Sequence, residues 1–283
     1  MIDDGSGDST AVTAAAAARQ LALPLRVLRA DFCNSGAARN FGVDHATGNF
    51  IYFLDADDEA LPGGLRSLVQ CLESSDRIDL AVGGHVVRID GSPDKERLPI
   101  GFSSGHRVNV RDYLTNRRGP IPMGSALLTR RTAAMAKFAE TVIYDEDTLY
   151  WAMVLSRADV QIVPRAVFVY NRDESRLAQR LLSSPRRQFL RISRALDLFA
   201  AIGIDESALR WRKGWIARGT ARALIHRGDF SAASEFMRAA LASGPRIRWS
   251  ARTLRYLVRM RMGMLARRLG IRRLSRPGDA EDR

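Results

Sequence analysis

Cysteine is scarce in this chain, which has only Cys33 and Cys71 among its 283 residues. Two isolated cysteines give neither a disulfide framework nor the spacing of a zinc site, so we expect a reducing compartment. No stretch approaches the roughly 20 consecutive apolar residues of a membrane-spanning helix, and no basic and then apolar leader opens the chain. These absences predict a cytoplasmic protein that, if it meets a membrane, lies peripherally at the inner face.

Acidic residues are also in deficit. Lys and Arg number 44 against 31 Asp and Glu, which gives a net charge of +13 and a pI of about 10.8. Such a charge indicates an anionic partner: a nucleic acid, a nucleotide or an anionic membrane surface. The basic helices expected near the C-terminus lack interleaved aromatic residues and any recognised nucleic-acid module, so we expect no nucleic acid among the partners.

Three carboxylates follow a short apolar run. Residues 50–54 read Phe-Ile-Tyr-Phe-Leu and are succeeded by Asp55, Asp57 and Asp58. The run is typical of a buried strand in a parallel sheet, and ligands of open α/β sheets bind outside the carboxyl ends of strands. Clustered carboxylates repel one another unless a cation lies among them, and oxygen ligands suit Mg²⁺ or Mn²⁺. The alternative is a solvated acidic turn before a helix near Pro62.

Two further segments combine a helix start with polar residues. Residues 34–42 form a glycine-containing loop that opens a helix, with Arg39 one turn in. Free N–H groups at a helix start suit phosphate, although an ordinary loop with a solvated arginine fits equally well. Glu146 and Asp147 open a later helix. They could simply favour the helix dipole, or one of them could act as a general base.

The remaining pattern predicts an α/β domain followed by helices. We expect helices at 11–21, 34–46, 62–73, 110–115, 131–137 and 144–157, and strands at 25–28, 50–54, 79–89, 123–128, 161–163 and 166–170. From about residue 175 strands vanish and Arg becomes dense, so we predict domains at 1–175 and 176–283. In the second, helices are expected at 185–201, 207–227, 230–242 and 250–269. They either lie on an anionic membrane or cap the sheet domain.

Four segments together resemble the family 2 glycosyltransferases, which have a GT-A fold. Residues 2–10 resemble the family's apolar–Asp-Asp-Gly-Ser segment, and 34–42 its Asn-x-Gly and Ala-Arg-Asn-x-Gly segment. Residues 46–58 resemble its Ala-x-Gly and Phe-Leu-Asp-x-Asp-Asp segment, and 146–147, followed by 170–172, its Glu-Asp pair and closing Tyr-x-Arg. The resemblance covers about residues 1–175 and implies an α/β, GT-A (Rossmann-like), mostly parallel sheet flanked by helices. The all-α basic extension lies outside it.

The resemblance also implies roles for the donor-binding residues. Asp3 and Asp4 would recognise the base and ribose of a nucleoside-diphosphate sugar, of which a UDP-sugar is the commonest, and Arg39 would lie near the nucleotide. Asp55 and Asp57 would hold the ribose and, through Mg²⁺ or Mn²⁺, the diphosphate.

The catalytic pair follows in the same way. Asp147 would deprotonate the acceptor hydroxyl with Glu146 as support, in a single inverting displacement assisted by the metal. The resemblance thus implies a hexosyltransferase-type enzyme of polysaccharide biosynthesis that acts on a glycan or lipid-linked acceptor.

The sequence departs from the family pattern at its N-terminus, and two alternatives to an active transferase remain. Members of the family normally begin some thirty residues earlier, with a strand and helix that lead into Asp3. Either the start codon is misassigned or the chain is a natural fragment. For a fragment we expect an N-terminally truncated sheet with an exposed apolar edge, and a truncated, inactive transferase-like binding protein is then an alternative. A haloacid-dehalogenase-like phosphatase also places Asp-x-Asp after an apolar strand, but it usually has Thr or Val where this chain has Glu59.

Overall fold

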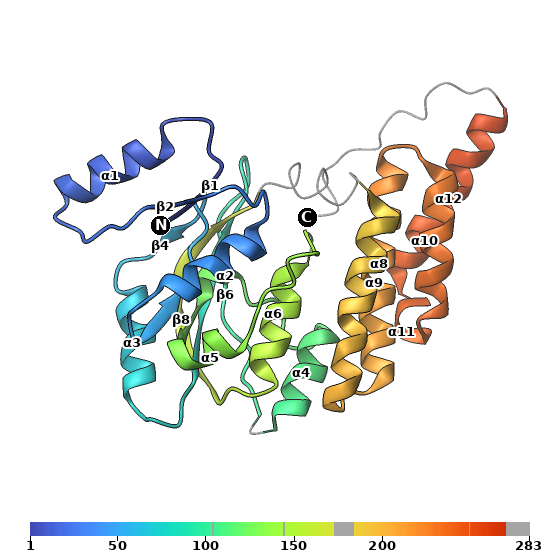
Figure 1. Cartoon of the computed structure of the whole chain (residues 1–283). Helices are drawn as coiled ribbons and strands as arrows, with labels where there is room; N and C mark the ends of the chain where they lie inside the picture. The colour runs from blue at the N-terminus through green and yellow to red at the C-terminus, as the bar shows by residue number, and fades with distance from the viewer. Residues whose placement is uncertain (104, 144, 173–183, 249, 270–283) are drawn as a thin grey trace.

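The computed structural model describes residues 1–103, 105–143, 145–172, 184–248 and 250–269. Figure 1 shows a sheet flanked by helices on one side of the molecule and a bundle of C-terminal helices on the other. The expected boundary between residues 175 and 176 lies outside the described residues. Within them, no helix is long and apolar enough to cross a lipid bilayer.

Two sheets form the α/β part. In the described chain β1 pairs only with β2, in parallel, and the larger sheet has the order β3-β7-β5-β8-β4 with β6 paired to β5. The strands are β1 Ile2–Asp4, β2 Leu28–Ala30, β3 Phe50–Tyr52, β4 Glu59–Ala60, β5 Leu80–Arg88, β6 Lys95–Arg97, β7 Ala126–Thr129 and β8 Val160–Asn171.

Helices cover the sheet and form the C-terminal bundle. In the first part they are α1 Thr10–Gln20, α2 Ser35–His45, α3 Gly64–Glu73, α4 His106–Leu114, the 3₁₀ turn η1 Met123–Ser125, α5 Arg130–Met135 and α6 Glu146–Leu155. The bundle consists of α8 Pro185–Asp197, the 3₁₀ segment η2 Leu198–Ile202, α9 Glu206–His226, α10 Phe230–Ala242, α11 Pro245–Arg248 and α12 Ala251–Arg268. Every helix expected from the sequence is present, with ends shifted by a few residues.

The sheet is mixed, so the expectation of a mostly parallel sheet was wrong. β3, β5 and β8 run in one direction, but β7 lies between β3 and β5 and is antiparallel to both. β4 and β6 are also antiparallel to their neighbours. An apolar run indicates burial on both faces of a strand but carries no information on its direction, which is why the sequence did not reveal β7's orientation.

The two short strands expected around Pro164 are one continuous strand, β8. It pairs with β5, and the register shifts at Gly83 and Gly84, opposite the proline. A proline cannot donate to the ladder and is tolerated in a sheet at such an irregularity. The strand therefore passes through Pro164 instead of ending there.

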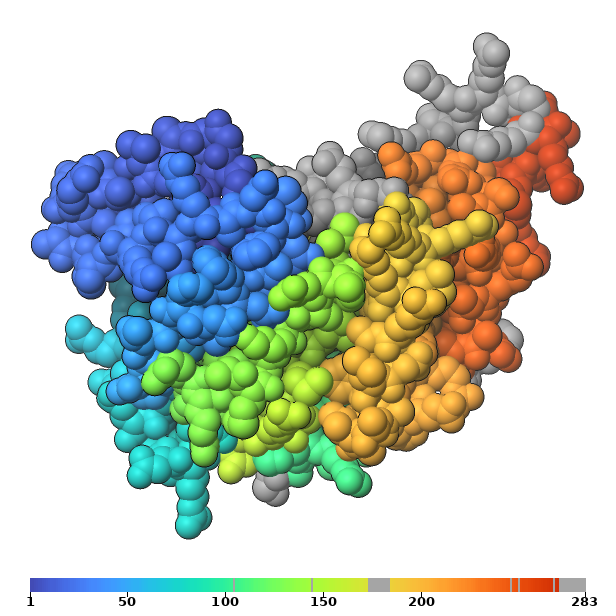
Figure 2. All heavy atoms as spheres, in the orientation of Figure 1, coloured from blue at the N-terminus to red at the C-terminus, as the bar shows by residue number. Residues whose placement is uncertain are grey.

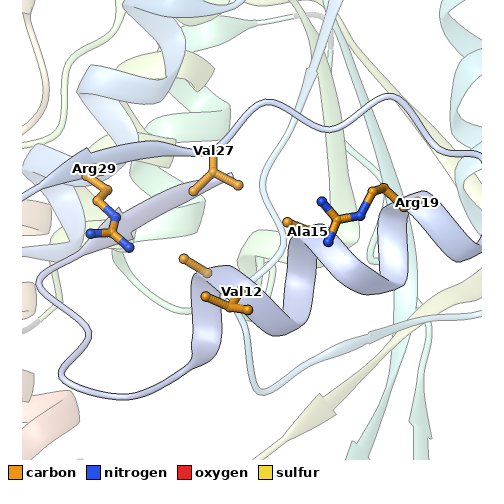
Figure 3. A pocket seen from close by; sticks show the side chains of 6 residues that line it. Val12, Ala15, Arg19, Val27 and Arg29 are labelled. Atoms are coloured by element: carbon orange, nitrogen blue, oxygen red, sulfur yellow. The ribbon is translucent and has the colours of Figure 1, made fainter.

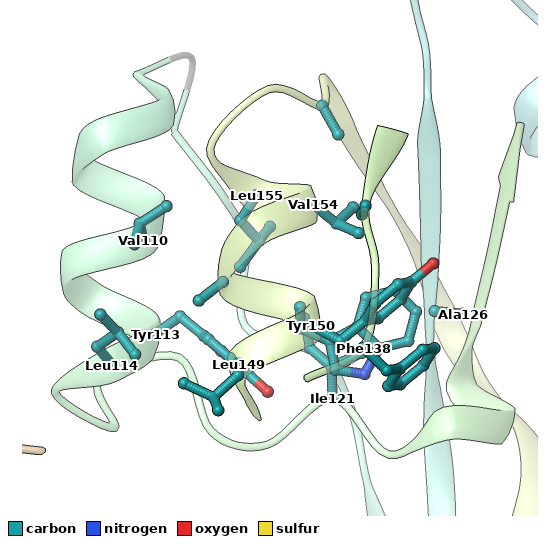
Figure 4. Close-up of a cluster of buried hydrophobic side chains, with 14 of the residues drawn as sticks. Val110, Tyr113, Leu114, Ile121, Ala126, Phe138, Leu149, Tyr150, Val154 and Leu155 are labelled. Carbon is teal, nitrogen blue, oxygen red and sulfur yellow. The ribbon is translucent and has the colours of Figure 1, made fainter. Parts of the chain in front are cut away.

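The main hydrophobic core joins the sheet to the helical bundle. Figure 4 shows side chains of α4 and α6 meeting beside the sheet, where the rings of Phe138 and Tyr150 stack with centroids 3.9 Å apart. The same cluster of buried side chains includes Ile192 of α8 and Leu209 and Ile216 of α9. The first C-terminal helices thus cover the α/β part, as the capping alternative predicts.

A second core holds the rest of the bundle together. It is formed by buried residues of α9, α10 and α12, including Ala221, Phe236 and Met260. α12 approaches α10 closely, because a Cβ at Gly263 would lie 2.1 Å from the Phe230 ring. In Figure 2 this red end of the chain lies at the edge of the molecule, away from the blue and green α/β part.

Candidate functional site

Arg39 joins three parts of the chain. Asn34 caps α2 by accepting a hydrogen bond from the Ala37 N–H, which fixes the start of the helix that carries Arg39. The mostly buried guanidinium donates to Asp55 at 2.6 Å, beyond the end of β3, and to Glu146 at 3.4 Å, at the start of α6. Three of the residues singled out from separate motifs therefore meet in one cluster.

Glu146 has a second partner that the sequence did not suggest. The Ser35 hydroxyl donates to its carboxylate at 2.9 Å, and Glu146 itself is buried. A serine directly after the cap of α2 is the only sequence signal for this contact. Ser35 and Arg39 together hold Glu146 beside the first turn of α2, where free N–H groups point outward.

Asp4 and Asp3 support the neighbouring loop. The Asp4 carboxylate accepts hydrogen bonds from the backbone N–H groups of residues 32, 33 and 34, at 2.6, 3.2 and 2.9 Å. Asp3 is buried and accepts from the Ser6 N–H at 3.1 Å, and its hydrogen bonds with Ser6 lower its pKa. Asp4 thus fixes the segment that leads into α2, next to Ser35. The predicted contacts of Asp3 and Asp4 with a nucleotide stay predictions.

The acidic segment after β3 is tied to the end of β8. The Asn171 N–H donates to Asp58 at 2.9 Å, and the Asn171 side chain donates to the Asp57 carbonyl at 2.6 Å. Burial raises the pKa of Asp58 to about 7, and the carboxylates of Asp55 and Asp57 add to this effect. The Asp58 carboxyl therefore lies close enough to Asp55 and Asp57 to be affected by both charges, and the predicted role of the three aspartates around a cation stays a prediction.

The carboxylates after β3 suit a divalent cation whose remaining ligands are phosphate oxygens of a bound substrate. The second carboxylate oxygen of Asp58 is buried and, among the described residues, has no hydrogen-bond donor. No three carboxylate, histidine or cysteine side chains in the described ranges are grouped as a metal cage. Mg²⁺ is usually bound by one or two carboxylates plus substrate phosphates instead of an all-protein cage. The donor set thus fits a metal that arrives with a diphosphate.

Asp147 lies one residue beyond Glu146 in the first turn of α6. It is partly buried, and one carboxylate oxygen accepts the Thr148 N–H at 2.7 Å. Burial and the adjacent carboxylates of Glu146 and Asp145 raise its pKa to about 7. Burial and the Asp147 carboxylate also raise the pKa of Tyr170, which belongs to the closing motif. A carboxylate with a pKa near neutrality can both accept and release a proton at pH 7.

The helical bundle contributes one residue to this region, and sequence reasoning missed it. Arg212 of α9 donates from Nε to Asp145 at 3.1 Å, forms a second hydrogen bond to the same carboxylate, and donates to the Thr148 hydroxyl at 2.8 Å. Both side chains of the ion pair are buried. Asp145 has a left-handed backbone (φ 64°) directly before α6. Arg212 thus fixes the turn that presents Glu146 and Asp147.

A hollow on the surface lies next to Asp3, on the side of α1 and β2. Figure 3 shows Val12, Ala15 and Arg19 of α1 facing Val27 and Arg29 across a space of about 380 Å³. Arg29 lies 3.9 Å from the Asp3 carboxylate. The hollow is open and largely apolar, and its two charged lining residues are Arg19 and Arg29.

Comparison with known sequences places the first half of the chain. Residues 1–136 match the family model described as glycosyl transferase family 2. The chain is 30% identical over 152 residues to the amylovoran biosynthesis glycosyltransferase AmsB of Erwinia amylovora, which covers 52% of this chain and 50% of that protein. It is 32% identical over 76 residues to the GalNAc(5)-diNAcBac-PP-undecaprenol beta-1,3-glucosyltransferase of Campylobacter jejuni, covering 27% and 24%. The chain thus spans half, or less, of the length of these relatives.

Solved structures show the same fold. TarS 1-349 of S. aureus in complex with UDP-GlcNAc has a TM-score of 0.59 and 15% identity, over 95% of this chain and 82% of that one. The mannosyltransferase PcManGT of Pyrobaculum calidifontis in complex with GDP-Man and Mn2+ has a TM-score of 0.51 and 16% identity, over 93% and 76%. The expected GT-A fold class is therefore confirmed.

Proposed function

We propose that the protein is a glycosyltransferase of polysaccharide biosynthesis, because residues 1–136 match the family model of glycosyl transferase family 2. The donor is a nucleoside-diphosphate sugar, with a UDP-sugar as the first choice, and the acceptor is a glycan or a lipid-linked glycan. One observation carries the proposal: Arg39 connects the acid after β3, Asp55, to the acid at the start of α6, Glu146. The names of both curated relatives support it.

The donor binds between β3, α2 and α6 in this proposal. Asp3 and Asp4 lie beside the base and ribose, and the first turn of α2 faces the phosphates, where N–H groups and the helix dipole favour negative charge. Arg39 keeps Asp55 and Glu146 in place and lowers the negative potential that a diphosphate meets. UDP-GlcNAc and GDP-Man in the two solved structures support a nucleotide-sugar donor.

Asp57 and Asp55 would hold Mg²⁺ or Mn²⁺ together with the diphosphate. The cation supplies neutralisation of the charge that develops on the leaving diphosphate. The Mn2+ in the mannosyltransferase structure supports this choice of cofactor. Asp58 lies close to both aspartates, since burial and the carboxylates of Asp55 and Asp57 raise its pKa to about 7.

Transfer proceeds with inversion at the anomeric carbon. The Asp147 carboxylate takes the proton of the acceptor hydroxyl, the hydroxyl oxygen bonds to the anomeric carbon, and the bond from that carbon to the diphosphate breaks. The nucleoside diphosphate leaves with the bonding electron pair. Glu146, held by Ser35 and Arg39, orients the first turn of α6 so that Asp147 faces the acceptor.

Release of nucleoside diphosphate tests the proposed activity. The full chain is incubated with a panel of UDP- and GDP-sugars, Mn²⁺ and a lipid extract as acceptor. We expect release of diphosphate from at least one donor, loss of that release with EDTA, and loss in Asp57→Asn. The matched control is Asp76→Asn, an exposed aspartate beyond α3, which should behave as the parent. A folded protein that releases nothing from any donor, with or without metal, contradicts the proposal.

A further inference from the structure

Helix α12 has two apolar faces, and only one is packed in the bundle. Thr253, Tyr256 and Met260 are buried against the neighbouring helices. A second set of apolar side chains is 44–65% exposed. We call it the outer stripe; it consists of Leu254, Val258, Met262, Leu265 and, just beyond the helix end, Leu269. At 100° per residue these five fall within about 80° of one another, so they form one continuous line along the helix.

Arginines border the outer stripe on both sides. By the same helical geometry Arg261 and Arg268 lie along one edge, and Arg255 and Arg259 along the other. All four are exposed. The arrangement is an apolar line between two rows of positive charge, on the side of α12 that faces away from the bundle core.

The surrounding sequence is uniformly basic. Residues 236–278 contain twelve arginines and no aspartate or glutamate, so this stretch accounts for nearly the whole net charge of +13. Figure 1 shows α12 as the outermost helix of the bundle, remote from the sheet. No carboxylate of this stretch competes with an external anionic surface for these arginines.

We propose that the outer stripe of α12 docks the protein on an anionic lipid bilayer. The stripe enters the boundary between headgroups and acyl chains while the bordering arginines bind anionic headgroups, as in interfacial amphipathic helices. A second protein or a second copy of this chain could cover an apolar line, but neither requires a stretch of twelve arginines that contains no acidic residue. The lipid surface matches both the apolar and the charged parts of the face. This inference goes beyond the donor site and does not depend on it.

Flotation with lipid vesicles tests the proposal. The full chain is mixed at 150 mM salt with vesicles of phosphatidylcholine alone or with 30 mol% phosphatidylglycerol. We expect binding to the anionic vesicles that weakens as salt is raised to 500 mM, and little binding to the neutral ones. Val258→Ser with Leu265→Ser should lower the partition coefficient at least tenfold. Arg261→Gln with Arg268→Gln should lower it about 25-fold, since one arginine near such a surface contributes about fivefold.

Matched controls use exposed residues of the α/β part. Leu65→Ser with Met135→Ser and Arg66→Gln with Arg77→Gln remove similarly exposed side chains and should bind vesicles as the parent does. Asp147→Asn should also bind as the parent, which separates this inference from the proposed function. Equal binding by the parent and both α12 variants overturns the proposal. So does a dimer, seen without lipid, that the Val258→Ser and Leu265→Ser changes dissociate, because the stripe then serves a second copy.

Discussion

Replacing Asp147 by asparagine should lower the rate of sugar transfer by about 10²–10⁴-fold, because general base catalysis contributes that much. Asparagine has nearly the same shape and can still accept the Thr148 N–H through its amide oxygen, so the first turn of α6 should keep its conformation. The measurement is kcat with the donor that the release assay identifies. Loss of kcat with little change in KM for the donor is expected, because Asp147 acts on the acceptor.

The pH dependence distinguishes a base from a structural acid. With a pKa of about 7, Asp147 is protonated and inactive at low pH, so kcat/KM should rise through pH 7, and the residual activity of Asp147→Asn should lack this limb. Stability should move in the opposite direction. The pKa of Asp147 in the folded protein lies above the ordinary value of 3.8. The contribution of Asp147 to the free energy of unfolding is therefore fully present below pH 3.8 and is lost as the pH rises through 7. Asp147→Asn should therefore be no less stable than the parent at pH 8.

Two outcomes would contradict this assignment. If Asp147→Asn retained more than a tenth of the parent kcat, Asp147 would not be the general base. Alternatively, the acidic limb near pH 7 could persist unchanged in the variant, which would place the titrating group elsewhere. Asp76→Asn serves as the control for an acid-to-amide change at an exposed site.

Replacing Arg212 by methionine should destabilise the protein by about 3–5 kcal/mol, since it leaves the buried Asp145 carboxylate without its cation. Arg212 makes two hydrogen bonds to Asp145, directly before α6, and one to the Thr148 hydroxyl, in the first turn of α6, so all of them connect α9 to the start of α6. The measurement is the free energy of unfolding in urea at pH 7.5. Activity at a temperature where the variant is folded should fall as well, because the same turn presents Glu146 and Asp147.

A second substitution separates the charge from the packing. Arg212→Met combined with Asp145→Asn removes the unpaired carboxylate, and asparagine tolerates the left-handed backbone of residue 145. The double variant should therefore be more stable than Arg212→Met alone. Arg210→Met, on the same helix but largely exposed, should cost less than about 1 kcal/mol. A loss below 1 kcal/mol for Arg212→Met itself would show that the ion pair does not hold the turn.

The local parts of the site were predictable from sequence, and the long-range ones were not. The start of α2 near Asn34 and the start of α6 at Glu146 follow from capping residues and acids in a first turn. The Arg212–Asp145 pair could not be found this way, because its partners lie 67 residues apart and Arg212 is one of many arginines in a basic region. Only the position of α9 in the folded chain, which brings Arg212 to the start of α6, selects it.

The same limit applies to the sheet and to α12. The apolar run of β7 predicts a strand, but the run does not indicate the direction of that strand. The antiparallel direction of β7 depends on the path of the chain between α4 and β7. The apolar positions of α12 were visible as a helical pattern, yet Tyr256, Met260 and Leu265 are all apolar. Which of them are exposed is decided by the contact of Gly263 with Phe230 on α10.

Calorimetric titration with UDP tests the central claim most directly, namely that Arg39, Asp55, Asp57 and Glu146 surround one donor site. In the presence of Mn²⁺ we expect saturable binding of one UDP per chain. The binding should be abolished by EDTA and by Asp55→Asn with Asp57→Asn, and retained in Asp76→Asn. Binding of UDP with the same affinity to the Asp55→Asn, Asp57→Asn protein, or no heat with UDP or GDP in the folded parent protein, would contradict the claim.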